Sequence, residues 1–240
     1  MPHTQSQRLI KKLEGLANSY FSAKVKHVKG FYESRIVNKQ LFFTIEILNK
    51  AISEKKKVSF RYGEYGLDQK LRPRLNQRGT PSVYTVNPYQ MIMANGRYYL
   101  IANMDIFDRA AYFRIDRILD IQSTDKKARP MKEVLGLEQG LDLPRHMAEH
   151  IYMFYGKSVR ARFVTDMSRI NDVMDWFSMD VRLKTLPDDK LEVSVQVNEE
   201  AMYYWCLQYG RHVELIEPPD LRERIAVAVA EMAQKYTNVD

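Results

Sequence analysis

Residues 84–102 read YTVNPYQMIMANGRYYLIA and predict a β-hairpin. Two strand candidates, residues 84–94 and 97–102, lie on either side of the pair Asn95-Gly96. A two-residue type I′ turn needs positive φ at both central positions, and Asn-Gly adopts that conformation more readily than most pairs. We therefore expect an antiparallel strand pair here, around which the neighbouring strands can be placed.

Further strand patterns flank this hairpin. Val58, Phe60 and Tyr62 alternate with polar residues, which is the period-two pattern of a half-buried strand. Other strand candidates are residues 72–75, 111–114 and 118–124. Several short strands separated by turns predict a small, strongly bent β-sheet or barrel, which we expect to span residues 57–128.

Helical spacing precedes this β-rich part. Apolar residues recur every three or four positions in residues 6–20 and again in residues 41–52, as in amphipathic helices. The first 40 residues hold eight basic and two acidic side chains, but simple helical patterns over roughly fifty residues do not make a complete winged helix-turn-helix. We expect residues 1–56 to form a helical linker and dimerisation segment, without a visible DNA-reading module.

The C-terminal part begins after residues 129–156, which we expect to be an interdomain linker. The strand candidates that follow are residues 158–164, 181–186, 190–197 and 213–216, and the helix candidates are residues 167–177, 199–208 and 221–236. Their order, βαββαβ with one extra helix, is that of a ferredoxin-like unit, expected over residues 157–240. The predicted fold class is therefore α+β: a helical linker, a small β-barrel and a ferredoxin-like domain.

Composition and charge favour a protein with a polyanionic partner. The 240 residues are 45% hydrophobic, enough for two compact domains. No run of eighteen apolar residues and no signal peptide is visible, so we expect a cytoplasmic protein without a membrane partner. Residues 1–140 hold 25 basic and 13 acidic side chains, a net charge of +12, whereas residues 141–240 hold 12 and 17, a net charge of −5. A polyanion would be drawn to the first part, although surface lysines can also cluster without function.

The β-rich part resembles the WYL domain of bacterial transcriptional regulators. The resemblance rests on Ala51-Ile52 at a helix end, VSFRY at residues 58–62, Pro88-Tyr89, YYL at residues 98–100 and FRIDRI at residues 113–118. Tyr98 stands where the family name has Trp. The C-terminal part resembles the WCX extension, through WCL at residues 205–207 and the residues that follow it.

The resemblance implies an Sm-like or SH3-like barrel for the first part and a ferredoxin-like fold for the second. Both agree with the residue patterns. It also implies a regulator that senses nucleic-acid ligands in a basic and aromatic cleft. Full-length relatives usually begin with a winged helix-turn-helix, so promoter DNA would be bound by an N-terminal module missing from this chain, and the protein would be a homodimer.

The candidate ligand-binding residues are arginines and tyrosines on or beside the predicted barrel strands. Arginine binds phosphate with two parallel hydrogen bonds, and tyrosine rings stack on bases. The candidates are Arg72, Arg74, Arg97, Arg114, Arg117, Tyr62, Tyr89 and Tyr99. Together they predict a site for a nucleotide or for single-stranded nucleic acid, with no cofactor.

Some of these residues have a purely structural alternative. Alternation over residues 113–118 places Arg114 and Arg117 on opposite faces unless the strand bends, so either one can be the partner of Asp116 or of a backbone carbonyl. Leu100 is expected in the core, with Tyr99 on the face of Arg97. Trp205 is expected in the core rather than at a ligand.

Catalysis is not expected. His146 and His150 have the spacing of a metal pair, but the zinc-protease glutamate and a third ligand are missing. Cys206, the single cysteine, lies in an apolar helical stretch, where an inert buried thiol is expected. We predict the ligand-sensing part of a regulator, with two alternatives: an accessory modulator of a nucleic-acid machine, or a dimerisation scaffold without a ligand.

Overall fold

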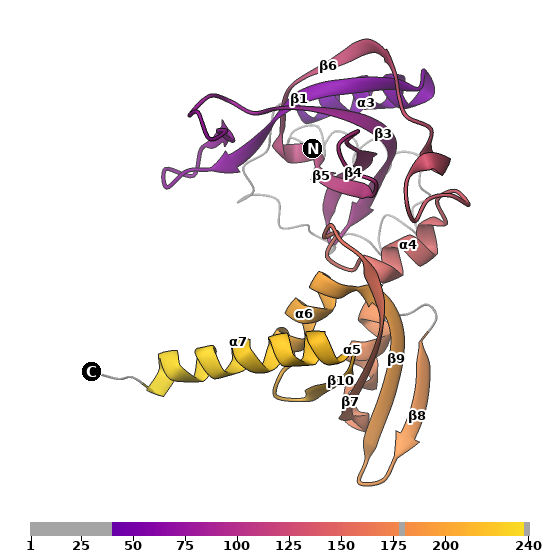
Figure 1. The fold of residues 1–240 in the computed structure, drawn as a ribbon, viewed down its shortest axis with the longest axis vertical. Coiled ribbons are helices and arrows are strands. Elements are labelled where there is room, and N and C mark those ends of the chain that lie inside the picture. The colour runs from indigo at the N-terminus through magenta and orange to yellow at the C-terminus, as the bar shows by residue number, and fades with distance from the viewer. Residues whose placement is uncertain (1–39, 178–180, 238–240) are drawn as a thin grey trace, which may run out of the picture. The chain divides into compact units, whose positions relative to one another are not determined.

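A computed structural model of the chain describes residues 40–177 and 181–237 (Figure 1). The helix expected at residues 6–20 and the basic stretch after it lie outside the described residues. Helix α3 (Leu41–Ser53) is followed by strands β1 (Lys56–Tyr65), β2 (Leu71–Pro73), β3 (Val83–Ala94), β4 (Arg97–Asn103), β5 (Ala110–Arg114) and β6 (Ile118–Lys127). A 3₁₀ turn, η1 (Ile115–Arg117), separates the last two strands.

These six strands form one sheet with the order β2-β1-β3-β4-β5, and β6 pairs with β1. The predicted β3–β4 hairpin is confirmed, because Asn95 and Gly96 have φ values of 50° and 67°, as a type I′ turn requires. Within the described residues, this pairing does not close the sheet into a barrel. The mixed α+β class is as predicted.

Strand β1 organises the first part of this sheet. It pairs antiparallel with β3 through Val58–Val86 and with β6 through Val58–Ser123. The side chains of Val58 and Phe60 on one face of β1 are almost fully buried, and α3 lies against β1 and β6. The period-two pattern of the sequence therefore corresponds to one buried face.

The chain divides into two compact units. The first unit comprises the chain up to Gln90 together with Phe113–Ala128, and the second comprises Met91–Tyr112 together with the chain from Arg129 onward. The division falls within β3 and within β5. The domain boundaries expected from the sequence remain predictions.

The second unit contains a four-stranded antiparallel sheet. Its elements are β7 (Ser158–Asp166), α5 (Ile170–Phe177), β8 (Arg182–Leu186), β9 (Lys190–Asn198), α6 (Glu199–Gln208), β10 (Val213–Glu217) and α7 (Pro219–Thr237). The strand order is β10-β7-β9-β8, so the first and third strands lie in the centre of the sheet, as in a ferredoxin-like unit. Before it, the expected linker contains the 3₁₀ turn η2 (Met131–Glu133) and the short helix α4 (Leu143–Glu149).

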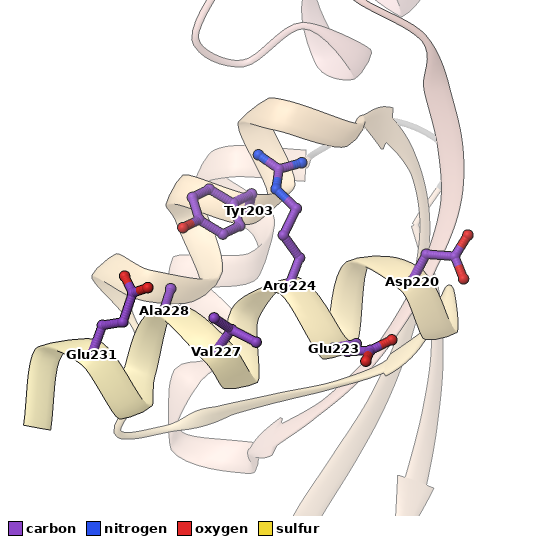
Figure 2. A pocket seen from close by; sticks show the side chains of 7 residues that line it. All are labelled: Tyr203, Asp220, Glu223, Arg224, Val227, Ala228 and Glu231. Atoms are coloured by element: carbon purple, nitrogen blue, oxygen red, sulfur yellow. The ribbon is translucent and has the colours of Figure 1, made fainter.

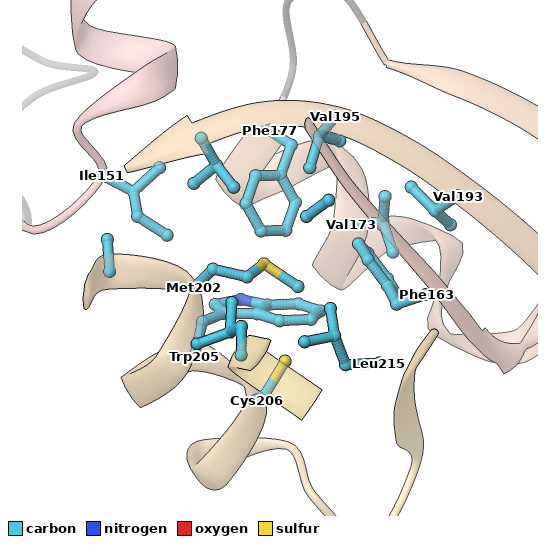
Figure 3. Close-up of a cluster of buried hydrophobic side chains, with 14 of the residues drawn as sticks. Ile151, Phe163, Val173, Phe177, Val193, Val195, Met202, Trp205, Cys206 and Leu215 are labelled. Carbon is cyan, nitrogen blue, oxygen red and sulfur yellow. The ribbon is translucent and has the colours of Figure 1, made fainter. Parts of the chain in front are cut away.

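Trp205 on α6 is central to the core of this sheet and its helices (Figure 3). Its ring lies 5.1 Å from that of Phe163 and 4.9 Å from that of Phe177, measured between centroids. The side chain is 1% exposed, which confirms the expected core position. Burial raises the pKa of the neighbouring Cys206 thiol to about 12, so this cysteine remains protonated and unreactive at neutral pH.

Among the described residues, no helix is both long enough and apolar enough to cross a membrane.

Replacing Trp205 by Ala removes the largest fully buried side chain. We expect Trp205→Ala to lower the free energy of unfolding by about 3–5 kcal/mol, the usual cost of such a cavity. Urea denaturation followed by circular dichroism measures the change. Tyr204→Ala is the matched control, because this neighbour on α6 is 49% exposed; it should cost less than about 1 kcal/mol. Equal losses would contradict the packing described above.

Candidate functional site

Four aromatic rings from three strands form a cluster in the first unit. Phe60 and Tyr62 come from β1, Tyr84 from β3 and Phe113 from β5. The distances between their ring centroids run from 5.2 to 6.5 Å, and most pairs are tilted or edge-to-face. Such pairs add about 0.5–1.5 kcal/mol beyond their buried area. Phe60 and Phe113 are buried, whereas Tyr62 and Tyr84 are half-buried, so the two tyrosine rings lie at the edge of the cluster.

Arg114 is tied down at the end of β5. Its Nε and Nη2 donate to the two carboxylate oxygens of Asp116 at 3.1 and 2.6 Å, a two-pronged pair. Its backbone N–H donates to the Tyr62 hydroxyl at 3.0 Å. The sequence left open whether Arg114 or Arg117 pairs with Asp116, and in the structure it is Arg114.

The chain bends immediately after Arg114. Strand β5 ends there, and Ile115–Arg117 forms the 3₁₀ turn η1 instead of continuing the strand. Alternation over residues 113–118 is therefore wrong beyond Arg114. Because of this bend, Arg114 and Arg117 both act electrostatically on the Tyr62 hydroxyl.

Arg117 differs from Arg72, Arg74 and Arg114, which each pair with a carboxylate, because it forms no ion pair with the described residues. Its Nε is buried, and no hydrogen-bond partner for this atom is found among the described residues. Its guanidinium carbon lies 5.7 Å from the centroid of the Tyr65 ring. Tyr65 is itself 40% exposed, so a cation and an aromatic face lie next to each other at the surface.

The Tyr62 hydroxyl is shielded from water. Burial raises the pKa of this phenol above its usual value, although the hydrogen bond from Arg114 and the charges of Arg117 and Arg114 act in the opposite direction. The phenol is therefore neutral at physiological pH. It accepts a hydrogen bond and carries no negative charge that would repel an anion.

Arg72 and Arg74 lie at the β1–β2 arm and form exposed ion pairs. Arg72 Nη2 is 2.6 Å from an oxygen of Asp68, and Arg74 Nε is 3.3 Å from an oxygen of Glu64. Arg74 also interacts electrostatically with Tyr84 of the aromatic cluster. Exposed pairs of this kind contribute about 0–1 kcal/mol, so a phosphate group can displace the carboxylate from either arginine at little cost.

The remaining candidates lie elsewhere. Tyr89 and Tyr99 are each 8% exposed on β3 and β4, and Leu100 is fully buried, as expected. Arg97 is exposed at the start of β4, in the second unit. Their roles in binding remain predictions.

The structure thus brings Tyr62, Arg114 and Arg117 together, with Arg74 joined to them through Tyr84. We call this group, with Tyr65, the Arg117 site. Tyr65 and Tyr84 were missed from the sequence, because their approach depends on strand register. Tyr84 lies beside Phe60 because these two residues are partners across β1 and β3. Predicting this contact requires the register of the two strands, which the alternation of apolar and polar residues does not give.

The histidine pair is packed within the second unit. His146 and His150 have ring centroids 4.4 Å apart, and His146 Nε2 is 2.9 Å from the Tyr112 hydroxyl. Burial lowers the pKa of His146 to about 4 and that of His150 to about 3. Both rings are therefore neutral at neutral pH, and their planes are tilted by 37° relative to each other. Among residues 40–177 and 181–237, no group of three or more histidine, cysteine, aspartate or glutamate side chains is placed to hold a metal ion.

A groove of about 450 Å³ lies between α6 and α7 in the second unit (Figure 2). Asp220, Glu223 and Glu231 contribute three carboxylates to its lining, against the single cation of Arg224. That cation pairs with Glu200 and lies 4.3 Å over the Tyr203 ring. This charge balance disfavours an anionic ligand in the groove.

Comparison with known proteins gives two family matches. The model of the WYL domain matches residues 44–123, and that of the WCX domain matches residues 157–233. Among proteins with curated functions, none matches the chain.

Two solved structures are similar to the chain at low identity. Proteasome accessory factor B/C of Arthrobacter aurescens is 18% identical, with a TM-score of 0.34 over 80% of this chain and 27% of that one. A structure described as a CRISPR Cas-related protein is 13% identical, with a TM-score of 0.45 over 82% of this chain and 53% of that one. The chain therefore spans about a quarter and about half of these two proteins.

The Arg114–Asp116 pair gives a testable stability prediction. The two side chains are only 18% and 28% exposed, so Asp116→Asn leaves a half-buried cation without its carboxylate. We expect a loss of about 1–3 kcal/mol in the free energy of unfolding, measured by urea denaturation. The control is Asp120→Asn, which breaks the exposed Arg61–Asp120 pair and should cost less than about 0.5 kcal/mol. Indistinguishable losses would contradict the role given to Asp116.

Proposed function

The chain is a WYL-domain protein with a WCX domain after it, and on this basis we propose that it is the ligand-sensing part of a transcriptional regulator. The proposed ligand is a nucleotide or a short single-stranded nucleic acid. The binding site is the Arg117 site of the first unit. The proposal assigns no catalytic step to the chain.

The observation that carries this proposal is the environment of Arg117. Its guanidinium lies beside the Tyr65 ring, and its buried Nε has no hydrogen-bond partner among the described residues. A buried donor without a partner costs about 1–3 kcal/mol, and a bound phosphate oxygen would recover this energy only by opening the site enough to reach Nε. A ligand that supplies both an anion and a flat ring satisfies Arg117 and Tyr65 together, and nucleotides have both groups.

The other residues of the site have complementary roles. The Arg114–Asp116 pair holds the bend that presents Arg117, so Arg114 is a positioning residue. Arg74 supplies a second cation when a phosphate replaces Glu64. Tyr65 supplies an exposed ring, and stacking a base on such a ring contributes about 1–3 kcal/mol.

Regulation would follow from a population shift. A ligand that binds one arrangement of the chain more tightly than another favours that arrangement. In a homodimer, such a change alters the spacing of the two DNA-reading modules and hence their fit to promoter half-sites. In this proposal promoter DNA is bound by a module outside this chain, and the protein works in the cytoplasm.

Arg117→Ala tests the site. Fluorescence anisotropy with a short labelled single strand should show at least about a tenfold loss of affinity, the usual effect of losing an arginine that contacts both phosphate and ring. The slope of the logarithm of affinity against the logarithm of salt concentration should fall by about one. Comparing DNA with RNA strands and with mononucleotides identifies the ligand class.

The matched control is Arg61→Ala. Arg61 is exposed and lies next to Tyr62 on β1, so its side chain points to the opposite face of the strand. The same charge is removed, yet affinity should change by less than about threefold, the scale expected for a charge outside the contact. Equal losses in both variants would refute a specific site, and no binding by the wild type would favour the dimerisation scaffold.

A further inference from the structure

A pocket of about 260 Å³ lies within the second unit. Its wall comes from residues 93–95 at the end of the β3–β4 hairpin, from several residues between 144 and 153 on and after α4, and from residues 175 and 176 at the end of α5. Pockets for drug-sized ligands usually measure roughly 300–1,000 Å³. This pocket therefore suits a compact ligand.

Two features hold the wall of the pocket in place. The side-chain amide of Asn95 donates a hydrogen bond to the backbone carbonyl of Ile151 at 2.8 Å, which ties the hairpin to the segment after α4. Met153 is only 6% exposed and has a φ of 54°, a left-handed conformation that is uncommon for a long side chain. Backbone strain of this kind tends to occur where a ligand binds.

Most side chains in the lining are apolar. Three methionines, Met93, Met147 and Met153, contribute to it together with Trp176. A thioether is flexible and polarisable, so methionines adapt their shape to the ligand they surround. Pro144 lies one helical turn before Met147 on α4 and also lines the pocket. An apolar group of modest size would therefore find contacts from several sides.

Asp175 is the single charged side chain in the lining. It is exposed in the last turn of α5, where the negative end of the helix dipole also favours a cation. Its carboxylate forms no hydrogen bond or ion pair with residues 40–177 and 181–237. Arg145 on α4 does not neutralise it, because its Nε lies 3.1 Å from a carboxylate oxygen of Glu149. A cation that enters the pocket thus meets an unpaired negative charge.

Trp176 places an aromatic ring beside this carboxylate. Its Nε1–H donates a hydrogen bond to the Tyr209 hydroxyl at 3.0 Å, and its ring packs edge-on against Tyr152 with 5.2 Å between centroids. The indole donor is thereby satisfied within the protein, so the ring offers a ligand its π surface. A cation within about 6 Å of such a ring is attracted by it, and tryptophan is the best ring for this contact.

We propose that this pocket is a second ligand site, which takes a compact apolar cation: a protonated amine or a quaternary ammonium group attached to an apolar body. Asp175 and Trp176 bind the cationic group, and the methionines surround the apolar body. This inference does not rest on the Arg117 site. The two sites lie in different units and select ligands of opposite charge.

Isothermal titration calorimetry of the full chain tests the proposed ligand class. The first probe is N,N-dimethylbenzylamine, which is protonated at neutral pH. The second is N,N-dimethylbenzamide, a neutral molecule of nearly the same shape. The amine should bind at least about fivefold more tightly than the amide, the scale of a cation contact with a ring and a carboxylate. An amide that binds as tightly as the amine, or no binding of either probe at millimolar concentration, would overturn the inference.

Asp175→Asn tests the charge without changing the size of the side chain. The affinity for the amine should fall at least about fivefold, whereas the affinity for the amide should stay the same. The matched control is Asp172→Asn on the same helix, because Asp172 pairs with Arg169 and does not line the pocket. This control should lower the affinity for the amine less than about twofold, since water and salt screen a more distant charge. Equal losses in the two variants would contradict a specific role for Asp175.

Ala148→Leu tests the location of the site. Ala148 lines the pocket on α4, and leucine fills space there while keeping a high helix propensity. The variant should lose at least about tenfold in affinity for the amine, with a circular dichroism spectrum like that of the wild type. Unchanged affinity in a folded variant would place the amine elsewhere and overturn the inference. If the variant does not fold, the fluorescence of Trp176 replaces this test, because the other tryptophan, Trp205, is 1% exposed. Binding of the amine should then change the tryptophan emission of the wild type, and an unchanged emission would overturn the inference.

Discussion

The two-pronged pair between Arg114 and Asp116 is the constraint on which the candidate site depends. The pair joins the last residue of β5 to the 3₁₀ turn η1. The backbone N–H of Arg114 also donates a hydrogen bond to the Tyr62 hydroxyl. Both carboxylate oxygens of Asp116 accept hydrogen bonds from Arg114. Arg117, three residues further on, is left with a buried Nε that finds no partner among the described residues, and with the ring of Tyr65 nearby. At this bend Arg114 therefore has a structural role, whereas Arg117 is available to bind a ligand.

This arrangement gives up some stability of the free protein. Pairing Arg117 with a carboxylate of its own would satisfy the buried donor and remove its attraction for an outside anion. Features that break a local rule without an evident compensation tend to occur at functional sites. The acidic groove beside α7 shows the opposite pattern, because its arginine is already paired with Glu200. The unpaired arginine lies in the first unit and the acidic groove in the second. This agrees with the excess of basic residues in the N-terminal part of the sequence and of acidic residues in the C-terminal part.

Much of the fold could be predicted from the sequence because its signals are local. The Asn95-Gly96 turn identifies a hairpin from two residues, and the order of helical and alternating segments after residue 157 identifies the ferredoxin-like unit. The bend at Ile115–Arg117 could not be predicted, since residues 113–118 alternate as a strand would and nothing local marks the end of β5. Tyr65 and Tyr84 were missed for a related reason: their proximity to the arginines comes from register and twist, which depend on pairing between distant segments. The arginines themselves were found because their chemistry is recognisable in any context, whereas their partners were not.

The most direct test of the account is to observe the Arg117 Nε–H group by ¹⁵N nuclear magnetic resonance, with its signal assigned from Arg117→Lys. The account predicts that a short single strand or a nucleotide shifts this signal towards that of a hydrogen-bonded guanidinium, while the Nε–H of Arg114, already bonded to Asp116, changes little. A ligand that binds the chain and leaves the Arg117 signal unmoved would contradict the central claim that this arginine is the one held ready for an anion.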